Sequence, residues 1–368
     1  MPSMKVGPET YGLPVAPKSS VQPELVLSHQ TVDDLVKSRI TPDTLFITDE
    51  YNYPQLKALG ARVEKVADTT PEAILKILNL PDYPRMHYIV GVGGCAALDS
   101  AKAAAVGKEC SVIPTVLSTN CITKNRSVIH DGENAFSYQT ATPSQVVVSL
   151  EDLSHQPESI KERWSGSGFG DYFAKIAAVL DQEAEAGRPG TEAALRKSDP
   201  ELMNGLDWVN DNFKGYDKES LGQLASLAHD AGLKVVHAGR NDKSVGGEHK
   251  FYYAAVGLYP HLRSLPTHGQ LVAIGTLITT RVMAEKSGDF TLHNKVEKAF
   301  QKLGLPTTQP GLDRLGVTRE VTESCLARIG QPDHPWSVLG QTFKNGDFGL
   351  LDRLFGEPES AWNTVGLA

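Results

Sequence analysis

Three residues far apart in the chain have the side chains of a divalent-metal site. Asp171 ends a Gly-Phe-Gly-Asp segment, His249 follows Gly-Gly-Glu, and His268 lies between a threonine and a glycine. Two neutral imidazoles and a carboxylate bind a divalent cation and leave one coordination position open for a substrate. The two histidines are too far apart to form a compact motif, and His261 between them is an equally simple candidate ligand from the residues alone.

A second candidate site is the glycine turn, Gly91-Val92-Gly93-Gly94, which follows an apolar run and precedes a segment of strong helix formers. A glycine turn between a strand and a helix lets the backbone approach a pyrophosphate, whose charge then lies at the helix N-terminus. A tight turn without any ligand gives the same pattern. Asp49 ends a neighbouring predicted strand. A carboxylate there can bind a ribose 2′-hydroxyl and repels a 2′-phosphate, which favours NAD over NADP; an exposed loop acid is the alternative.

The elements that position these residues alternate in the first part of the chain. Short apolar runs predict strands and the segments between them predict helices, so we expect a parallel, doubly wound sheet with ligands at the strand ends. Beyond about residue 155 the segments have helical length and periodicity. The predicted strands are 44–48, 61–66 and 86–90, and the predicted helices are 53–59, 71–78, 172–186, 221–231, 271–286 and 291–303. We therefore predict an α/β dinucleotide-binding domain over 1–155 and a helical metal-binding domain over 156–368.

The composition narrows the class of partner. A chain of 368 residues fits two domains, and a net charge of −8 without a basic block argues against nucleic acid or an anionic membrane. No run approaches the roughly 20 apolar residues of a membrane span. The polar, proline-rich N-terminus lacks the order of a signal peptide, and the four cysteines form no CxxC pair. We expect a reducing compartment, the cytoplasm, and a small-molecule substrate.

Four blocks follow one another over about residues 40 to 310. They are the glycine turn with 99–102, Pro114–Ser118, Gly168–Lys175, and 247–249 with 268–269. In their order and approximate spacing they resemble the iron-containing alcohol dehydrogenase and dehydroquinate synthase superfamily. The resemblance is strongest to its sn-glycerol-1-phosphate dehydrogenase and glycerol dehydrogenase branch, and 304–306 also fits the family's helical domain.

The resemblance implies a dehydroquinate synthase-like fold, in which a Rossmann-like α/β N-terminal domain binds the cofactor and an all-α C-terminal domain binds the metal. Asp171, His249 and His268 match the family's metal ligands, which leaves His261 as a bystander. The residues that match the pyrophosphate turn are Gly93, Gly94, Cys95, Ala96 and Ala97. Thr115 to Ser118 match a second loop that contacts the cofactor, with Thr115 and Ser118 as the expected contacts.

The chemistry implied by the resemblance is hydride transfer between NAD or NADP and a polyol, a glycerol phosphate-like compound or a related polar alcohol or ketone. The metal acts as a Lewis acid on the substrate oxygen. Zinc is the expected cation, with nickel and iron(II) as alternatives that accept the same ligands. Members of the family are usually oligomers, which implies a homo-oligomer.

Departures from the family pattern gather around the substrate. Cys95 replaces the third turn glycine, and Asn120 replaces a substrate-facing aspartate, so its amide can bind a hydroxyl but cannot take its proton. Tyr253 replaces a second histidine and can either donate a proton or merely pack. Cys121 stands where the phosphate-using branch tends to have glycine. Lys124, where the family often has a cofactor-contacting serine, binds an anionic substrate group or is simply a solvated loop lysine.

Two rival functions fit parts of the pattern. A sugar-phosphate cyclase of the dehydroquinate synthase type uses NAD transiently and resembles the chain at His268, although that branch commonly has glutamate where Asp171 stands. A cofactor-binding protein that has lost catalysis is the other rival, given Asn120 and Tyr253. The retained Asp171, His249 and His268 argue against it, because a catalytically dead site has no physical need for all three.

Overall fold

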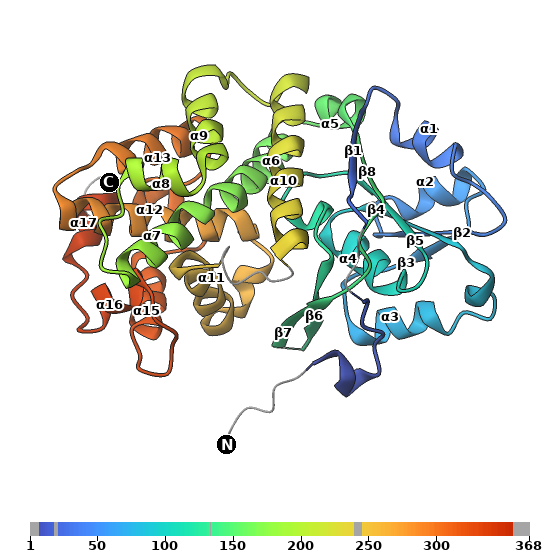
Figure 1. Ribbon diagram of the computed structural model, residues 1–368, viewed down its shortest axis with the longest axis horizontal. Coiled ribbons are helices and arrows are strands. Elements are labelled where there is room, and N and C mark those ends of the chain that lie inside the picture. Colours follow the sequence, from blue (N-terminus) through green and yellow to red (C-terminus); the bar gives the residue numbers. More distant parts are fainter. Residues whose placement is uncertain (1–6, 18–20, 133, 239–244, 356–368) are drawn as a thin grey trace, which may run out of the picture. The chain divides into compact units, whose positions relative to one another are not determined.

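The computed structural model describes residues 7–17, 21–132, 134–238 and 245–355. The chain forms two compact units, Met1–Ser165 with Tyr216–Arg240, and Gly166–Gly215 with Asn241–Ala368 (Figure 1). We expected one boundary after residue 155. The structure instead assigns 156–165 and 216–240 to the first unit, because helix α10 (Lys218–Ala238) packs against elements of that unit. Gly232 illustrates how closely it packs, since a Cβ there would lie 2.5 Å from Thr123 Cβ.

Unit 1 contains a sheet of six parallel strands in the order β1-β8-β5-β4-β2-β3. The strands are β1 (Glu24–Ser28), β2 (Thr44–Thr48), β3 (Val63–Lys65), β4 (Tyr88–Gly93), β5 (Glu109–Pro114) and β8 (Gln145–Ser149). From β2 the chain runs to β3 on one side and then to β4 on the other, so the strand order reverses between β2 and β4. Ligands of open α/β sheets bind at the carboxyl ends of strands at such a reversal. Since Thr48 pairs with Val92, Asp49 lies beside Gly93.

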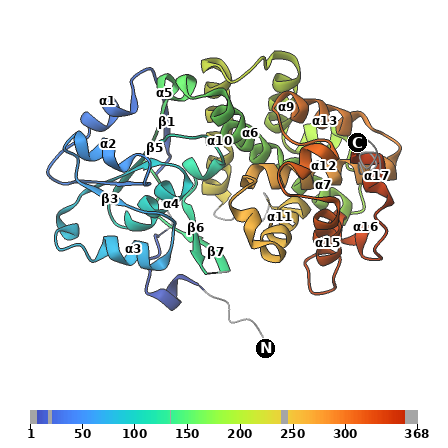
Figure 2. The same cartoon turned by 180° about the vertical axis from the view of Figure 1, so that it is seen from behind.

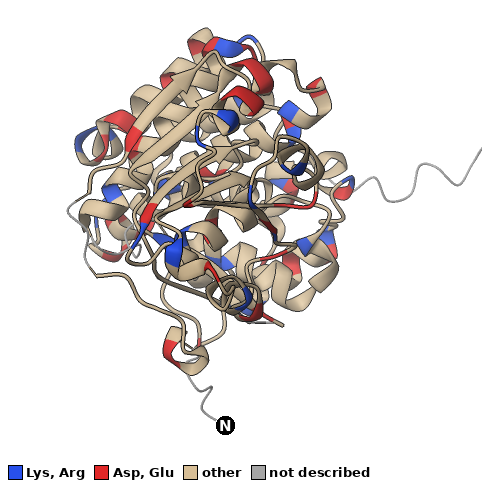
Figure 3. Ribbon diagram, turned by 90° about the vertical axis from the view of Figure 1, so that its right-hand side faces the viewer, with Lys and Arg blue, Asp and Glu red and all other residues tan. Residues whose placement is uncertain are grey.

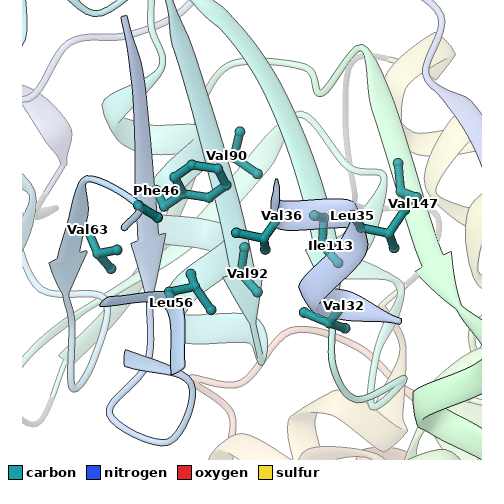
Figure 4. Close-up of a cluster of buried hydrophobic side chains, with 11 residues drawn as sticks. Val32, Leu35, Val36, Phe46, Leu56, Val63, Val90, Val92, Ile113 and Val147 are labelled. Atoms are coloured by element: carbon teal, nitrogen blue, oxygen red, sulfur yellow. The ribbon is translucent and has the colours of Figure 1, made fainter. Parts of the chain in front are cut away.

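The helices of unit 1 cover both faces of the sheet. Besides α10 and the start of α6 (Glu158–Phe173), they are α1 (Val32–Lys37), α2 (Tyr53–Ala58), α3 (Pro71–Leu78), α4 (Cys95–Ala104) and α5 (Leu150–His155). On one face, side chains from α1 and α2 pack against strand residues such as Phe46, Val90 and Val92 (Figure 4). Each large apolar side chain buried there contributes about 1.5–3 kcal/mol relative to exposure. This cluster fixes β2 beside β4, which is what the glycine turn requires.

Helix α4 covers the other face and starts at the glycine turn. Its residues 97–104 are all buried, and a Cβ at Gly91 would lie 2.8 Å from Ala101 Cβ, so the helix lies directly on β4. A hairpin of β6 (Arg126–Asp131) and β7 (Asn134–Gln139) lies beside α4 (Figure 2). Its residues Ile129 and Tyr138 belong to the same buried cluster as Ala103 of α4. The predicted doubly wound sheet is therefore confirmed. The strand predicted at 86–90 begins at Tyr88 and continues to Gly93, so it includes most of the turn.

The described residues of unit 2 form helices joined by loops, and none of them lies in a strand. After the C-terminal part of α6 (Glu158–Phe173) the order is α7 (Lys175–Glu185), α8 (Glu192–Ser198), α9 (Pro200–Asn212), α11 (Gly247–Leu258), α12 (His268–Ser287), α13 (Thr291–Lys302), α14 (Gln309–Asp313), α15 (Arg319–Ile329), α16 (Val338–Phe343) and α17 (Gly349–Phe355). Helix α12 is the centre of the unit, with α7, α11, α13 and α16 packed around it. The helix predicted at 172–186 is interrupted at Ala174, and the one predicted at 221–231 is α10 of unit 1.

Charge is mixed over the surface. In Figure 3 basic and acidic segments alternate over the face shown, and the described part of it carries no continuous basic tract. Among the described helices, none has the length and apolar character needed to cross a membrane.

Candidate metal centre and cofactor turn

Unit 2 brings Asp171, His249 and His268 together. One ligand atom from each lies within 4.8 Å of the others. The Asp171 Oδ1 atom is 3.3 Å from His268 Nε2 and 3.9 Å from His249 Nε2. Ligand atoms about 2.0–2.1 Å from a tetrahedral zinc ion lie about 3.3–3.4 Å apart. The donor set and its spacing therefore fit a divalent cation, and we call these three residues the metal cluster.

Glycines allow the helices that carry the metal cluster to approach one another. Helix α6 carries Asp171, and α12 begins at His268. A Cβ on Gly170 would lie 2.5 Å from Gly269 O, and one on Gly269 would lie 1.8 Å from Ser167 O. The Gly269 N–H also donates to Ser167 Oγ at 3.1 Å. Because no side chain separates α6 from α12 here, the residues next to the two glycines can share one ion.

The third ligand, His249, is held by the residue before it. Glu248 is fully buried, and its Oε1 accepts hydrogen bonds from Gly246 N at 2.9 Å and His249 Nδ1 at 2.7 Å. Since Nδ1 donates to this carboxylate, Nε2 carries the lone pair that faces Asp171. A Cβ on Gly275 of α12 would lie 2.6 Å from Glu248 Cα, so α11 and α12 also meet at a glycine. This role of Glu248 was not predicted from the sequence, although an acidic residue directly before a ligand histidine is a signal for it.

Buried carboxylates make the surroundings of the metal cluster negative. Asp171 is 5% exposed, and Asp181 lies nearby, accepting hydrogen bonds from Gly247 N at 2.6 Å and Val338 N at 2.7 Å. Burial, with a further contribution from the charge of Glu248, raises the pKa of Asp181 to about 6. This concentration of buried negative charge favours a cation.

His268 is fixed by its position at the start of α12. Thr267 and Gln270 form a capping box there. The ring of Tyr252 lies edge-on to that of His268, with 4.4 Å between the centroids. Tyr252 is a neighbour of the metal cluster that the sequence analysis did not identify, because one aromatic residue in a helix gives no sign of which ring it will contact.

Two other residues named from the sequence lie outside the metal cluster. Tyr253 follows His249 by one turn of α11 and is 53% exposed, and its pKa is raised by partial burial and then by the charges of Asp171 and Glu248. His261 lies in the short 3₁₀ helix Pro260–Arg263, with its ring edge-on to Tyr259. His261 is not among the clustered ligand residues.

Unit 1 holds the glycine turn in a conformation that depends on glycine. Gly93 has φ +137°, and a Cβ there would lie 2.2 Å from Asp49 Oδ2. The same oxygen accepts a hydrogen bond from Gly94 N at 3.1 Å, while Asp49 Oδ1 accepts from Asn52 N and Nδ2. Asp49 therefore fixes the turn itself, and its contact with a ribose hydroxyl stays a prediction.

The first residues of α4 offer amides to an anion. Gly94 is the N-cap of this helix, and Cys95, Ala96 and Ala97 are its first three residues. The first N–H groups of an α-helix have no partner within the helix, and they lie at the positive end of its dipole. This arrangement suits the pyrophosphate of a dinucleotide.

A fully buried lysine supports the loop after β5. Lys102 Nζ donates to the backbone oxygens of Cys121 at 2.8 Å, Arg126 at 3.0 Å and Lys124 at 3.2 Å, and pairs with Asp99 Oδ1 at 2.7 Å. Its role was not assigned from the sequence. The loop is also tied to the turn, since Thr115 N donates to Gly93 O at 3.1 Å.

The remaining predicted residues lie in or next to this loop. Ser118 and Asn120 are buried, whereas Lys124 is half-buried. Their contacts with cofactor or substrate stay predictions.

Comparison with known proteins shows which proteins the chain resembles. Residues 35–157 match the family described as iron-containing alcohol dehydrogenase. The chain is 27% identical over 301 residues to a glycerol-1-phosphate dehydrogenase [NAD(P)+] of Sulfurisphaera tokodaii, covering 80% of this chain and 81% of the relative. It is 26% identical to one of Methanosphaerula palustris, over 72% and 67% of the two chains. The chain therefore resembles members of the iron-containing alcohol dehydrogenase superfamily.

The fold is also similar to that of a solved structure. A structure of a probable glycerol dehydrogenase from Sinorhizobium meliloti 1021 superimposes with a TM-score of 0.64 at 18% identity, covering 88% of this chain and 96% of the other. The match to the superfamily's sequence family includes Asp49, the glycine turn and the loop to Lys124 but ends before Asp171. The convergence of the metal cluster is therefore an observation that does not depend on that family match.

Proposed function

We propose that this protein is a metal-dependent, NAD(P)-linked oxidoreductase that acts on a polyol, a glycerol phosphate-like compound or a related polar alcohol or ketone. The observation that carries the proposal is the convergence of Asp171, His249 and His268 with ligand-like spacing. The glycine turn at the strand-order reversal supports the cofactor half of the proposal. The glycerol-1-phosphate dehydrogenases similar to this chain support the substrate class.

Each group of residues has a separate task in this proposal. Asp171, His249 and His268 hold a divalent cation, and Glu248 keeps His249 Nε2 available for it. The amides of residues 93–97, with Thr115 and Ser118, hold the cofactor. When bound, the cation supplies Lewis-acid polarisation of the substrate oxygen and the nicotinamide supplies hydride exchange. Asn120 donates a hydrogen bond to a substrate hydroxyl, Lys124 binds an anionic substrate group, and Tyr253 exchanges a proton.

Zinc is the cation we propose for this site. Two imidazoles, one carboxylate and one open position are the ligand set of catalytic zinc sites. Nickel and iron(II) accept the same donors, so elemental analysis of the purified protein decides among the three. The carboxylate of Asp49 favours NAD over NADP.

A spectrophotometric assay tests the function. The metal-loaded protein is incubated with NAD or NADP and with glycerol, sn-glycerol 1-phosphate or sn-glycerol 3-phosphate. We expect a net rise in absorbance of the reduced cofactor with at least one substrate, and loss of the signal after chelation. No net change with any of these alcohols or the corresponding ketones would contradict the proposal. A cyclase that uses NAD transiently would give no net change.

We also propose that the protein acts in the cytoplasm as a homo-oligomer. All four cysteines are free thiols, which suits a reducing compartment. Light scattering of the purified chain measures the oligomeric state.

A further inference from the structure

Two cysteine thiols that the proposed reaction does not use meet at the cofactor turn. Cys95 is the first residue of α4, and Cys121 lies in the 3₁₀ helix η3 (Asn120–Ile122) of the loop after β5. Their Sγ atoms are 3.0 Å apart, and both residues are half-buried. A disulfide bond has a length of about 2.03–2.05 Å, so the two sulfur atoms need to approach by only about 1 Å.

The surroundings give the two thiols different reactivity. Cys95 Sγ lies 3.3 Å from Thr119 Oγ1 and 3.4 Å from Ser118 Oγ, and it accepts a hydrogen bond from the Cys121 thiol. That bond from Cys121 lowers the pKa of Cys95, aided by Ser118 and Thr119 and opposed by burial and the charge of Asp99. The start of a helix also favours a thiolate. Cys95 is thus the nucleophile of the pair, and Cys121 is the thiol that reacts second.

The other two cysteines provide an internal comparison. Cys110 and Cys325 are buried, and burial raises the pKa of each to about 12. A buried, protonated thiol reacts slowly with oxidants. Of the four, only Cys95 and Cys121 have a second sulfur within hydrogen-bonding distance.

We propose that Cys95 and Cys121 form a reversible disulfide that switches off cofactor binding at the glycine turn. The oxidant is a hydroperoxide, with hydrogen peroxide as the simplest case. The Cys95 thiolate attacks one peroxide oxygen, the O–O bond breaks, and the departing hydroxide takes up a proton to become water. Cys121 then attacks Cys95 Sγ, loses its proton, and expels the sulfenic hydroxyl as a second water. Two thiols are oxidised by two electrons and one peroxide is reduced; a dithiol reverses the reaction by exchange.

The structural consequence falls on the pyrophosphate site, so this regulation rests on the proposed function. Both segments joined by the new bond are anchored. Gly94 N donates a hydrogen bond to Asp49 Oδ2, and Cys121 O accepts one from Nζ of the buried Lys102. Closing the sulfur–sulfur distance therefore displaces the first turn of α4 or the loop that carries Ser118. A displacement of either segment misaligns the amides that face the pyrophosphate, and the loss of one hydrogen bond to a charged group lowers affinity about tenfold or more.

The test uses the full-length, reduced protein exposed to increasing hydrogen peroxide. Peptide mass spectrometry without reduction measures the crosslink, and fluorescence titration measures NAD(P) binding. We expect a Cys95–Cys121 crosslink while Cys110 and Cys325 remain thiols, a dissociation constant at least about tenfold higher, and recovery with dithiothreitol. Cys121→Ser and Cys121→Ala should lose the crosslink and the reversible loss of binding, each compared with its own untreated form. Cys110→Ala and Cys325→Ala should behave like the wild type.

Two results would overturn the inference. One is oxidation of Cys95 to sulfinic acid with no crosslink at any peroxide concentration. The other is a complete crosslink with unchanged cofactor binding. Both readouts are independent of any alcohol substrate. An absence of dehydrogenase activity would therefore defeat the proposed function and leave the crosslink measurable, whereas an active enzyme without the crosslink would defeat only the switch.

Discussion

The metal cluster binds its ligand through side-chain atoms, whereas the glycine turn offers backbone atoms. In unit 2, the side chains of Asp171, His249 and His268 supply the ligand atoms, and Glu248 orients one of them. In unit 1, the backbone amides at the start of α4 offer the anion site, and side chains serve mainly to fix the turn. The metal cluster therefore depends on side-chain identity, whereas the turn depends on backbone conformation and on space.

This difference explains why four of the five departures from the resemblance lie in unit 1, whereas Tyr253 is the one in unit 2 and all three ligand residues are retained. Cys95 replaces a glycine without blocking the turn, because its side chain packs against Ser118 and Thr119. A side chain is not tolerated in the same way at Gly93, because its φ of +137° is strained for any residue other than glycine. The comparison gives predictions that differ between the two units.

The largest effect on metal content and on stability should follow Gly269→Ala. The new Cβ would lie 1.8 Å from Ser167 O, so α6 and α12 must separate and Asp171 can no longer share an ion with His268. Overpacking of this kind costs about 1–3 kcal/mol or more. We expect loss of bound metal and a lower free energy of unfolding, measured by elemental analysis and denaturant titration. Gly257→Ala is the control, because a Cβ there meets nothing within 4 Å; a similar loss of metal in both variants would refute the role of the close approach.

Gly93→Ala should be the corresponding change in unit 1. An alanine at φ +137° is strained by about 1–3 kcal/mol, and its Cβ would contact Asp49 Oδ2. We expect NAD(P) affinity to fall on the order of a hundredfold while bound metal is retained. Gly222→Ala on α10 of the same unit is the control, because the nearest atom to a Cβ there is Leu27 Cδ1 at 3.6 Å. Equal losses of affinity in the two variants would show that the effect is not specific to the turn.

Glu248→Ala should weaken metal binding about 10–100-fold, the usual effect of removing a group that orients a ligand. It leaves Gly246 N and His249 Nδ1 without their acceptor. Glu248→Gln should recover part of the affinity, since its amide oxygen still accepts from Nδ1. Competition with a chromophoric chelator measures the metal dissociation constant. If the two variants bound metal equally weakly, the loss of affinity would come from the missing negative charge of Glu248 and not from its hydrogen bond to His249.

The smallest effect, a change in KM alone, should follow Lys124→Ala. A lost charge-assisted hydrogen bond should raise KM for a phosphorylated substrate about tenfold and leave KM for glycerol unchanged. Steady-state kinetics with both substrates measure the difference, and Lys37→Ala on the exposed face of α1 is the control. An unchanged KM for both would remove Lys124 from substrate binding.

The local sequence pattern of apolar and helix-starting residues predicted much of the sheet, but it did not predict the contacts between distant segments. The strand at 44–48 and the helix at 71–78 were found with their predicted bounds, because a fully buried strand and a proline-started helix have strong signals. The packing of α10 in unit 1 was missed, since it depends on the contact of Gly232 with Thr123. The ligand residues were named from the resemblance, whereas Glu248, Ser167 and Lys102 act through partners that only the fold brings near.

The most direct test of the account is the metal content of four purified variants. We predict one divalent ion per chain in the wild type and in His261→Ala, and loss of that ion in Asp171→Ala, His249→Ala and His268→Ala. NAD(P) binding should persist in all of them, because the glycine turn belongs to the other unit. An ion retained in the three ligand variants, or lost only in His261→Ala, would contradict the account.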